Sequence, residues 1–197
     1  MVKFSDAFIG KIQAAKMRFP VRVTYHETLE FLYWACLASE RLLSEASDEC
    51  LARGDCGKLG LYYLNHLEEE KGELPFLVND LKAAGREIQP LPDPIAIAMI
   101  GTQYYLLKHV HPVCLLGYMA VQEATPTPLE AVEVFEKYYG SEQVTFIRMH
   151  AEKDLIHREE LIAMIEDCPE DQQSLIYLSI QNTLDYLGQH YAGVTDG

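Results

Sequence analysis

The segment from His150 to His157 holds the residues best suited to chemistry. It reads His150-Ala-Glu-Lys-Asp-Leu-Ile-His157, so His150, Asp154 and His157 occupy positions i, i+4 and i+7. On an α-helix these three side chains lie within about 60° of one another and project from one face. With 7 His and 30 Asp and Glu residues in 197, chance would produce roughly 0.04 such triples. Two imidazoles and a carboxylate in this arrangement predict a site for a first-row transition metal.

A second group of possible ligands has the same spacing. His66, Glu70 and Glu73 also stand at i, i+4 and i+7, within a helix that we expect from about residue 58 to 84. Facing helices with inward carboxylates and histidines form the metal sites of helical bundles, and two metals need about six protein ligands. Glu123 closes an almost entirely apolar segment, where a buried carboxylate must be paired or coordinated. The expected ligands are therefore His66, Glu70, Glu73, Glu123, His150, Asp154 and His157.

Each group also has a simpler interpretation. The glutamates from 68 to 73 form a charge run, which is usually a solvated helix face. His66 can be a core histidine, Glu123 can end its helix at the surface, and the triple from 150 to 157 can belong to an exposed face. The metal hypothesis is favoured because a site requires all these residues together, whereas a surface requires none of them.

The remaining pattern predicts an all-α chain with one helical domain over residues 1–197. Alternating β-branched runs are few, whereas apolar residues recur at helical spacing between helix caps and prolines. Three prolines in 86–94 indicate a loop, and Ser141 is expected to cap the helix that carries the His150 motif. The expected helices cover about 5–17, 24 or 26 to beyond 43, 58–84, 95–109, 112–126, 127–140, 141 to beyond 162, and 169–191.

Composition excludes several classes of protein. The 16 Lys and Arg residues against 30 Asp and Glu leave a net charge of −14, which argues against nucleic acid and anionic membrane surfaces as partners. The first residues lack the apolar stretch of a signal peptide, and no apolar segment is long enough to span a bilayer. Five cysteines without zinc-type spacing indicate reduced thiols in a cytoplasmic protein.

Three segments resemble the haem-oxygenase-like diiron oxidase and oxygenase family, whose members are also called iron-containing redox enzymes. The first is Tyr62-Tyr-Leu-Asn-His-Leu-Glu-Glu-Glu-Lys-Gly-Glu73, followed by Asn79-Asp-Leu81 and Gly85. The second runs from Gly101-Thr-Gln-Tyr-Tyr through His111-Pro-Val-Cys-Leu-Leu-Gly-Tyr118 to Glu123. The third is the His150 motif, which is similar to the family's HxxxDxxH helix. These segments occur in the family's order and cover roughly residues 60–160.

The resemblance implies a seven-helix haem-oxygenase-like bundle with a non-haem diiron site. It assigns as ligands Glu70 (or Glu69), Glu123, His150, Asp154 and His157. It also implies activation of O₂ to oxidise a small amino-acid-like or fatty-acid-like substrate. The family's third helix usually places His where this chain has Glu73, so His66 is the candidate for the missing nitrogen ligand. Because a glutamate there favours harder ions, Mn or a mixed site is an alternative to two Fe ions.

Two other functions stay open at this stage. Relatives of the same fold class, the TenA-like thiaminases and the quinone-cofactor oxidase PqqC, work without a metal, so fold alone does not establish iron. A non-enzymatic helical binding protein could use the same residues as a polar network. The expected partners of an enzyme would be O₂ and a small molecule, with a homodimer as a possible assembly.

Overall fold

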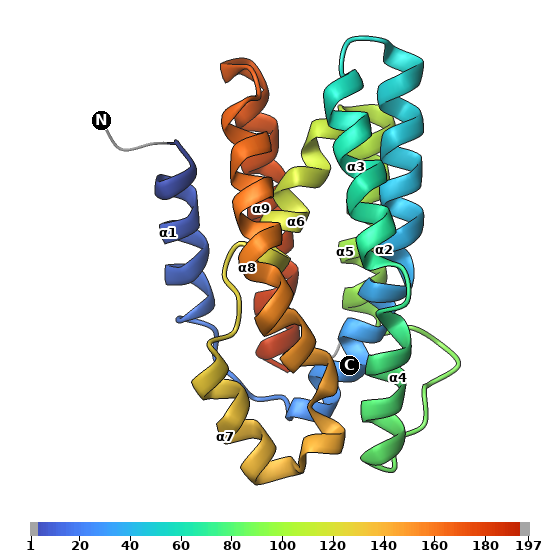
Figure 1. The fold of residues 1–197 in the computed structure, drawn as a ribbon, viewed down its shortest axis with the longest axis vertical. Coiled ribbons are helices and arrows are strands. Elements are labelled where there is room, and N and C mark those ends of the chain that lie inside the picture. Colours follow the sequence, from blue (N-terminus) through green and yellow to red (C-terminus); the bar gives the residue numbers. More distant parts are fainter. Residues whose placement is uncertain (1–3, 194–197) are drawn as a thin grey trace.

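A computed structural model describes the chain from Phe4 to Gly193, and within these residues it is built from helices alone. The long helices stand side by side as an upright bundle, with α1 at one edge and α7 across one end (Figure 1). In chain order the elements are α1 (Phe4–Lys16), α2 (Tyr25–Arg53), α3 (Gly57–Glu70), α4 (Leu74–Ala83), α5 (Pro94–His109), the 3₁₀ turn η1 (Pro112–Cys114), α6 (Leu115–Glu123), α7 (Leu129–Tyr139), the 3₁₀ turn η2 (Ser141–Gln143), α8 (Thr145–Glu166) and α9 (Glu170–Tyr191).

The short helix α6 forms the centre of the bundle. Nearly all of its side chains are buried, and they join the core shared by α2, α5 and α9. Gly117 lies against α9, so closely that a Cβ atom at this position would stand 2.7 Å from Ser179 Cβ. Because Gly117 has no side chain, α6 and α9 can approach closely. This contact sets the position of α6, and with it the position of Glu123 at the end of that helix.

The expected single helix from 58 to 84 is wrong, because it is divided into α3 and α4. The break lies at Lys71–Glu73, where Gly72 has a φ of +90° that side-chain-bearing residues rarely adopt. Glu73 is consequently the N-cap residue of α4 rather than part of α3. The helical spacing of His66, Glu70 and Glu73 is lost, and Glu73 is placed by the turn.

The expected cap of the motif helix at Ser141 is also wrong. Ser141 begins the turn η2, and α8 starts only at Thr145. The cap comes from Asp80 of α4, whose carboxylate accepts from Thr145 N at 3.1 Å, from Phe146 N at 2.8 Å and from the Thr145 hydroxyl. A buried carboxylate from a distant helix thus satisfies the first amides of α8 and holds it against α4.

The all-α prediction is confirmed, but the expected number of seven helices is too small. The described residues form the helices α1 to α9, because the third predicted helix is broken and residues 129–139 form a helix of their own.

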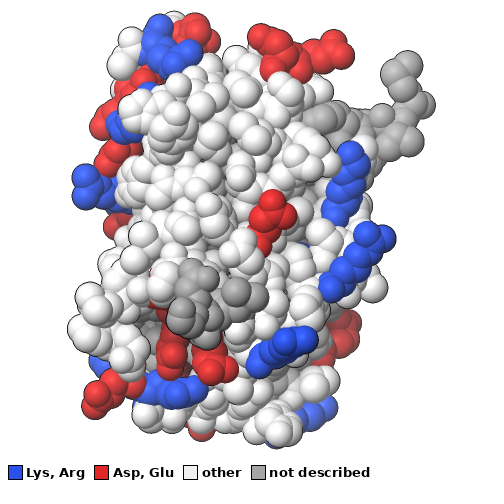
Figure 2. Space-filling model, turned by 180° about the vertical axis from the view of Figure 1, so that it is seen from behind, with Lys and Arg blue, Asp and Glu red and all other residues white. Residues whose placement is uncertain are grey.

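All five cysteines are free, as predicted. No helix of the described residues is long and apolar enough to cross a membrane. On the face shown in Figure 2, charged side chains lie mostly at the margins.

We expect Asp80→Ala to lower the free energy of unfolding by about 2–3 kcal/mol, because buried donors at the start of α8 would lose their acceptor. Asp80→Asn keeps one acceptor oxygen and should cost less. Urea unfolding monitored by circular dichroism measures both changes. The exposed Asp48 on α2 provides the control, since Asp48→Ala should change stability by only a few tenths of a kcal/mol. Equal effects at the two positions would contradict this role of Asp80.

Candidate metal centre

The residues predicted as metal ligands come together between α3, the start of α4, the end of α6 and the middle of α8. Most of them are buried polar residues of the bundle interior: His66, Glu73, Glu123, Asp154 and His157. Glu70 and His150 are partly buried and complete the cluster. Three stretches far apart in the chain, residues 66–73, the end of α6 and the middle of α8, thus place acidic and imidazole side chains in one region.

The first group within this cluster consists of His66, Glu123 and His157. One potential ligand atom from each lies within 4.8 Å of those of the other two, and all three side chains are buried. His66 Nε2 is 3.3 Å from Glu123 Oε1, and the two imidazole rings meet edge to face with centroids 4.8 Å apart. Two nitrogens and a carboxylate at these separations have the composition of a transition-metal site.

The second group is formed by Glu73, His150 and Asp154. His150 Nε2 lies 3.3 Å from Glu73 Oε2, and His150 Nδ1 lies 3.1 Å from Asp154 Oδ1. Glu70 lies near both groups, with Oε1 3.7 Å from His66 Nε2 and with electrostatic interactions to Glu73, Glu123 and His150. All seven predicted ligands are therefore neighbours, including Glu73 after the helix break.

The two candidates for the acidic ligand of α3, Glu70 and Glu69, approach the histidines from different sides. Glu70 lines the internal cavity described below. Glu69 is 43 % exposed, and its Oε2 lies 3.7 Å from His66 Nδ1 and 3.5 Å from His157 Nε2. Glu70 is thus the carboxylate on the cavity side, and Glu69 borders the site toward solvent.

Lys153 is a site residue that the sequence reasoning missed. Its ammonium donates to Glu73 Oε1 at 2.7 Å and to the Glu69 carbonyl at 3.1 Å. Lys153 lies inside the His150 motif, so its position in the sequence was a signal. Helical spacing alone, however, does not predict that its side chain contacts Glu73 at the start of α4. Lys153 therefore compensates the negative charge of the Glu73 carboxylate.

Several potential ligand atoms are buried and make no hydrogen bond of good geometry, although each has an imidazole or carboxylate atom 3.3–3.8 Å away. Among the described residues, the unpartnered atoms of the site are His66 Nδ1, Glu73 Oε2, Glu123 Oε2 and His157 Nδ1. Leaving a buried polar atom without a partner costs about 1–3 kcal/mol, and more for a charged group. Four such atoms in one cluster fit a site whose side chains bind a cation.

The acidic surroundings change the protonation of the cluster. Burial alone would lower the pKa of His66, but Glu123, Glu70 and Glu69 raise it to about 9. Burial raises the pKa of the Glu70 carboxyl, and the charges of Glu73 and Glu123 raise it further. In the absence of a metal, protons therefore supply the positive charge that these carboxylates require.

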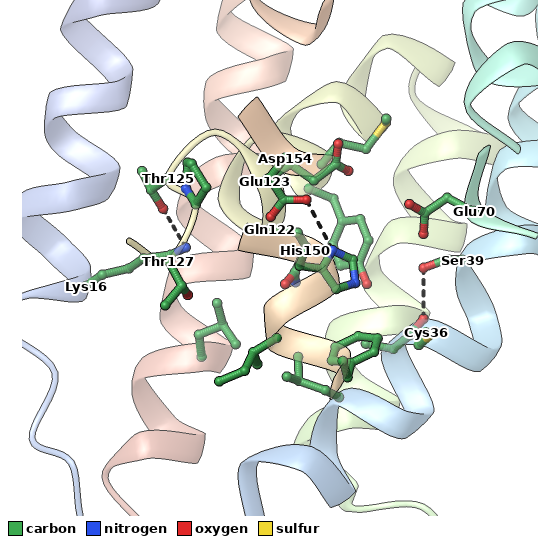
Figure 3. A pocket seen from close by; sticks show the side chains of 18 of the residues that line it. Lys16, Cys36, Ser39, Glu70, Gln122, Glu123, Thr125, Thr127, His150 and Asp154 are labelled. Atoms are coloured by element: carbon green, nitrogen blue, oxygen red, sulfur yellow. Dashed lines mark hydrogen bonds and ion pairs between the residues drawn. The ribbon is translucent and has the colours of Figure 1, made fainter. Parts of the chain in front are cut away.

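A cavity of about 450 Å³ opens beside this cluster (Figure 3). His66, Glu70, Glu123, His150 and Asp154 form part of its wall. Tyr118 and Met119 of α6 also line this cavity. The volume lies within the range of small-molecule pockets.

Comparison with known proteins identifies the fold. No family model and no curated protein matches the sequence. A crystal structure from Shewanella denitrificans, described as a domain of unknown function with a haem oxygenase-like fold, is similar with a TM-score of 0.72. The two chains are 16 % identical, and the match covers 95 % of this chain and 89 % of the other. This chain has a haem oxygenase-like fold. The expected haem-oxygenase-like fold is thereby confirmed, though not its seven-helix count, and this similarity does not test the activity.

Another group of ligand-type side chains lies apart from the cluster. Asp55, Cys56 and His111 have one ligand atom each within 4.8 Å of the others. Asp55 is exposed, and His111 Nδ1 already accepts from Val113 N at 3.1 Å. The spacing of these residues along the chain carried no signal of their proximity.

We expect the affinity for Mn(II), measured anaerobically by calorimetry, to rise with pH between 7 and 9. His66 has a raised pKa of about 9, so it is protonated below that pH, and a metal must displace this proton. Affinity should fall about tenfold for each pH unit below 9 for each proton displaced. An affinity that is constant from pH 7 to 9 would contradict ligation by His66.

Proposed function

We propose that this protein is a non-haem dinuclear iron oxidase or oxygenase that uses O₂ to oxidise a small molecule in the internal cavity. The main supporting observation is the set of buried ligand atoms of His66, Glu73, Glu123 and His157 that have no hydrogen-bond partner among the described residues. Burial without partners is costly for a merely structural cluster, and metal coordination would remove that cost. The resemblance of the His150 motif to HxxxDxxH supports the same function.

The two groups described above are assigned to two metal ions. His66, Glu123 and His157 would hold the first. His150 and Glu73 would hold the second, with Asp154 against the other nitrogen of the His150 ring. Glu70, which interacts electrostatically with both groups, would be shared. When bound, two ferrous ions supply the electrons that activate O₂.

The residues of the chain determine the environment of that chemistry. The Asp154 carboxylate contacts His150 Nδ1 and thereby selects the orientation of that imidazole. Burial of the cluster within the bundle excludes bulk water and strengthens the electrostatic interactions inside. The cavity wall brings a small molecule into contact with His150, Asp154 and Glu123.

The second group is expected to bind its ion more weakly than the first. Lys153 contacts Glu73 at 2.7 Å, so an ion must compete with an ammonium for this carboxylate. The group is also rich in oxygen, which favours harder ions such as Mn(II). A mixed or partly loaded centre is therefore the expected state at low metal concentration.

The alternative is a metal-free enzyme similar to the TenA-like or PqqC-like proteins. The ion pair of Lys153 with Glu73 and the contact of His66 with Glu123 favour it, because protonated histidines and lysine also neutralise buried acids. Metal binding distinguishes the two functions directly.

The protein purified anaerobically should bind Fe(II), and His157→Ala should lose the ion of the first group. Replacing this imidazole leaves His66, Glu123 and the shared Glu70 as donors for that ion, and the loss of one ligand lowers affinity by at least about tenfold. His109 is an exposed histidine on α5, so His109→Ala is the matched control with full metal content. Iron counted by a colorimetric chelator decides the outcome. Equal iron in His157→Ala and the wild type would make the ligand assignment wrong.

Removing the competing ammonium should strengthen the second site. We expect Lys153→Met to bind the second Fe(II) more tightly than the wild type, and Glu73→His should do the same by supplying a nitrogen ligand. Calorimetric titration of each variant with Fe(II) reports both affinities. Lys71 is an exposed lysine paired with Glu68, so Lys71→Met should leave both affinities unchanged. An unaltered second affinity in both site variants would show that Lys153 and Glu73 do not limit the site.

A further inference from the structure

The cavity beside the candidate metal centre has one lysine and no arginine among the described residues that line it. This residue, Lys16, lies in the last turn of α1, and its side chain extends toward the segment that follows α6 (Figure 3). Its Nζ donates a hydrogen bond to Thr125 Oγ1 at 2.7 Å. An ammonium has three N–H donors, so two remain for a bound molecule.

Lys16 has no acidic partner at close range. None of the ion pairs found among residues 7–193 includes it. Burial lowers the pKa of Lys16 to about 8, and the more distant charge of Asp154 opposes this change. The ammonium is therefore mostly protonated at neutral pH, and even partial burial of a cation without a counter-ion is unfavourable. An anionic group bound in the cavity would remove this cost.

Other polar donors line the same cavity. Gln122 Nε2 is buried and has no hydrogen-bond partner among the described residues. The Thr127 side chain also lines the cavity, and Figure 3 shows it near Lys16 and Thr125. Carboxylate oxygens accept hydrogen bonds from such ammonium, amide and hydroxyl donors.

The rest of the lining is mainly apolar and includes Phe19, Val21, Leu32 and Leu187. A molecule that fills the cavity thus requires an apolar body as well as an anionic end. The predicted metal ligands do not provide the positive charge for that end. Their four carboxylates, on Glu70, Glu73, Glu123 and Asp154, would already balance the charge of two divalent ions.

We infer that Lys16, together with the Gln122 amide, binds the carboxylate of a small monocarboxylic acid whose apolar part occupies the remaining cavity. This inference rests on the proposed function in one respect, because the bound acid would be the substrate of that reaction. It adds to that function a binding residue on α1, a helix that contributes no metal ligand.

The test measures binding of octanoate to protein from which metals have been removed with a chelator. Isothermal titration calorimetry should detect octanoate binding to the wild type, and Lys16→Met should weaken it about tenfold or more through loss of a charge-assisted hydrogen bond. Lys16→Arg should retain binding within about threefold. Binding of 1-octanol, which lacks the charge, should be equal in the wild type and Lys16→Met, and this also verifies that the variant is folded.

Lys11 is the matched control, because it lies on the same helix, is exposed and sits over the Tyr177 ring at 4.7 Å. Lys11→Met should leave octanoate binding unchanged. The inference is overturned if the wild type does not bind octanoate, or if Lys16→Met binds it as tightly as the wild type does. It is also overturned if Lys11→Met has the same effect as Lys16→Met.

Counting the iron bound by the same protein and variants after anaerobic reconstitution with Fe(II) separates the two proposals. Iron binding without Lys16-dependent octanoate binding would leave the proposed function standing and overturn the role of Lys16. Lys16-dependent octanoate binding without iron binding would support the carboxylate site and remove the dinuclear iron function.

Discussion

The structure depends on one electrostatic constraint, which is the burial of several carboxylates in a small volume between α3, α4, α6 and α8. Carboxylates so close together repel one another and lose hydration, so they require positive charge in the same space. The chain supplies part of it through His66, His150 and Lys153. The raised pKa of His66 and the unpartnered atoms of Glu73 and Glu123 indicate that this supply is incomplete. A bound divalent cation would satisfy the remainder.

The surrounding scaffold is organised so that this cluster can form. Gly72 allows the chain to turn between α3 and α4, which brings Glu73 to His150. Asp80 on α4 holds the first residues of α8, so both helices that contribute to the second group are joined by a buried carboxylate cap. Gly117 permits the close packing of α6 on α9 that sets the position of Glu123. Gly72 and Gly117 act through backbone geometry, and Asp80 acts through its side-chain carboxylate.

Lys153 and Lys16, the two lysines near the candidate metal centre, differ in the charged groups that surround them. Lys153 is partly exposed and forms an ion pair with the carboxylate of Glu73, so its positive charge is already compensated. Lys16 extends from α1 into the cavity, and its hydrogen-bond partner among residues 7–193 is a hydroxyl, that of Thr125. The chain has a net charge of −14, yet no ion pair within these residues compensates this partly buried ammonium. The difference between the two positions follows from the packing of α1 against the rest of the bundle.

The sequence by itself determined the helical class, most helix positions and the shared face of His150, Asp154 and His157, because helical periodicity and the i, i+4, i+7 spacing are local properties. It also named Glu73, but on a helical spacing that the structure does not have. Prediction from the sequence was wrong where a contact between distant parts of the chain replaced a local sequence pattern. The break at Gly72 converted one predicted helix into two, and Asp80 replaced Ser141 as the cap of α8. Only the tertiary structure decided that Glu73 meets Lys153, that Glu70 rather than Glu69 faces the cavity, and that Lys16 enters it. These contacts join residues about 80 or more positions apart, or depend on which side of α3 faces inward. Both are consequences of how the helices pack and cannot be derived from spacing along the chain.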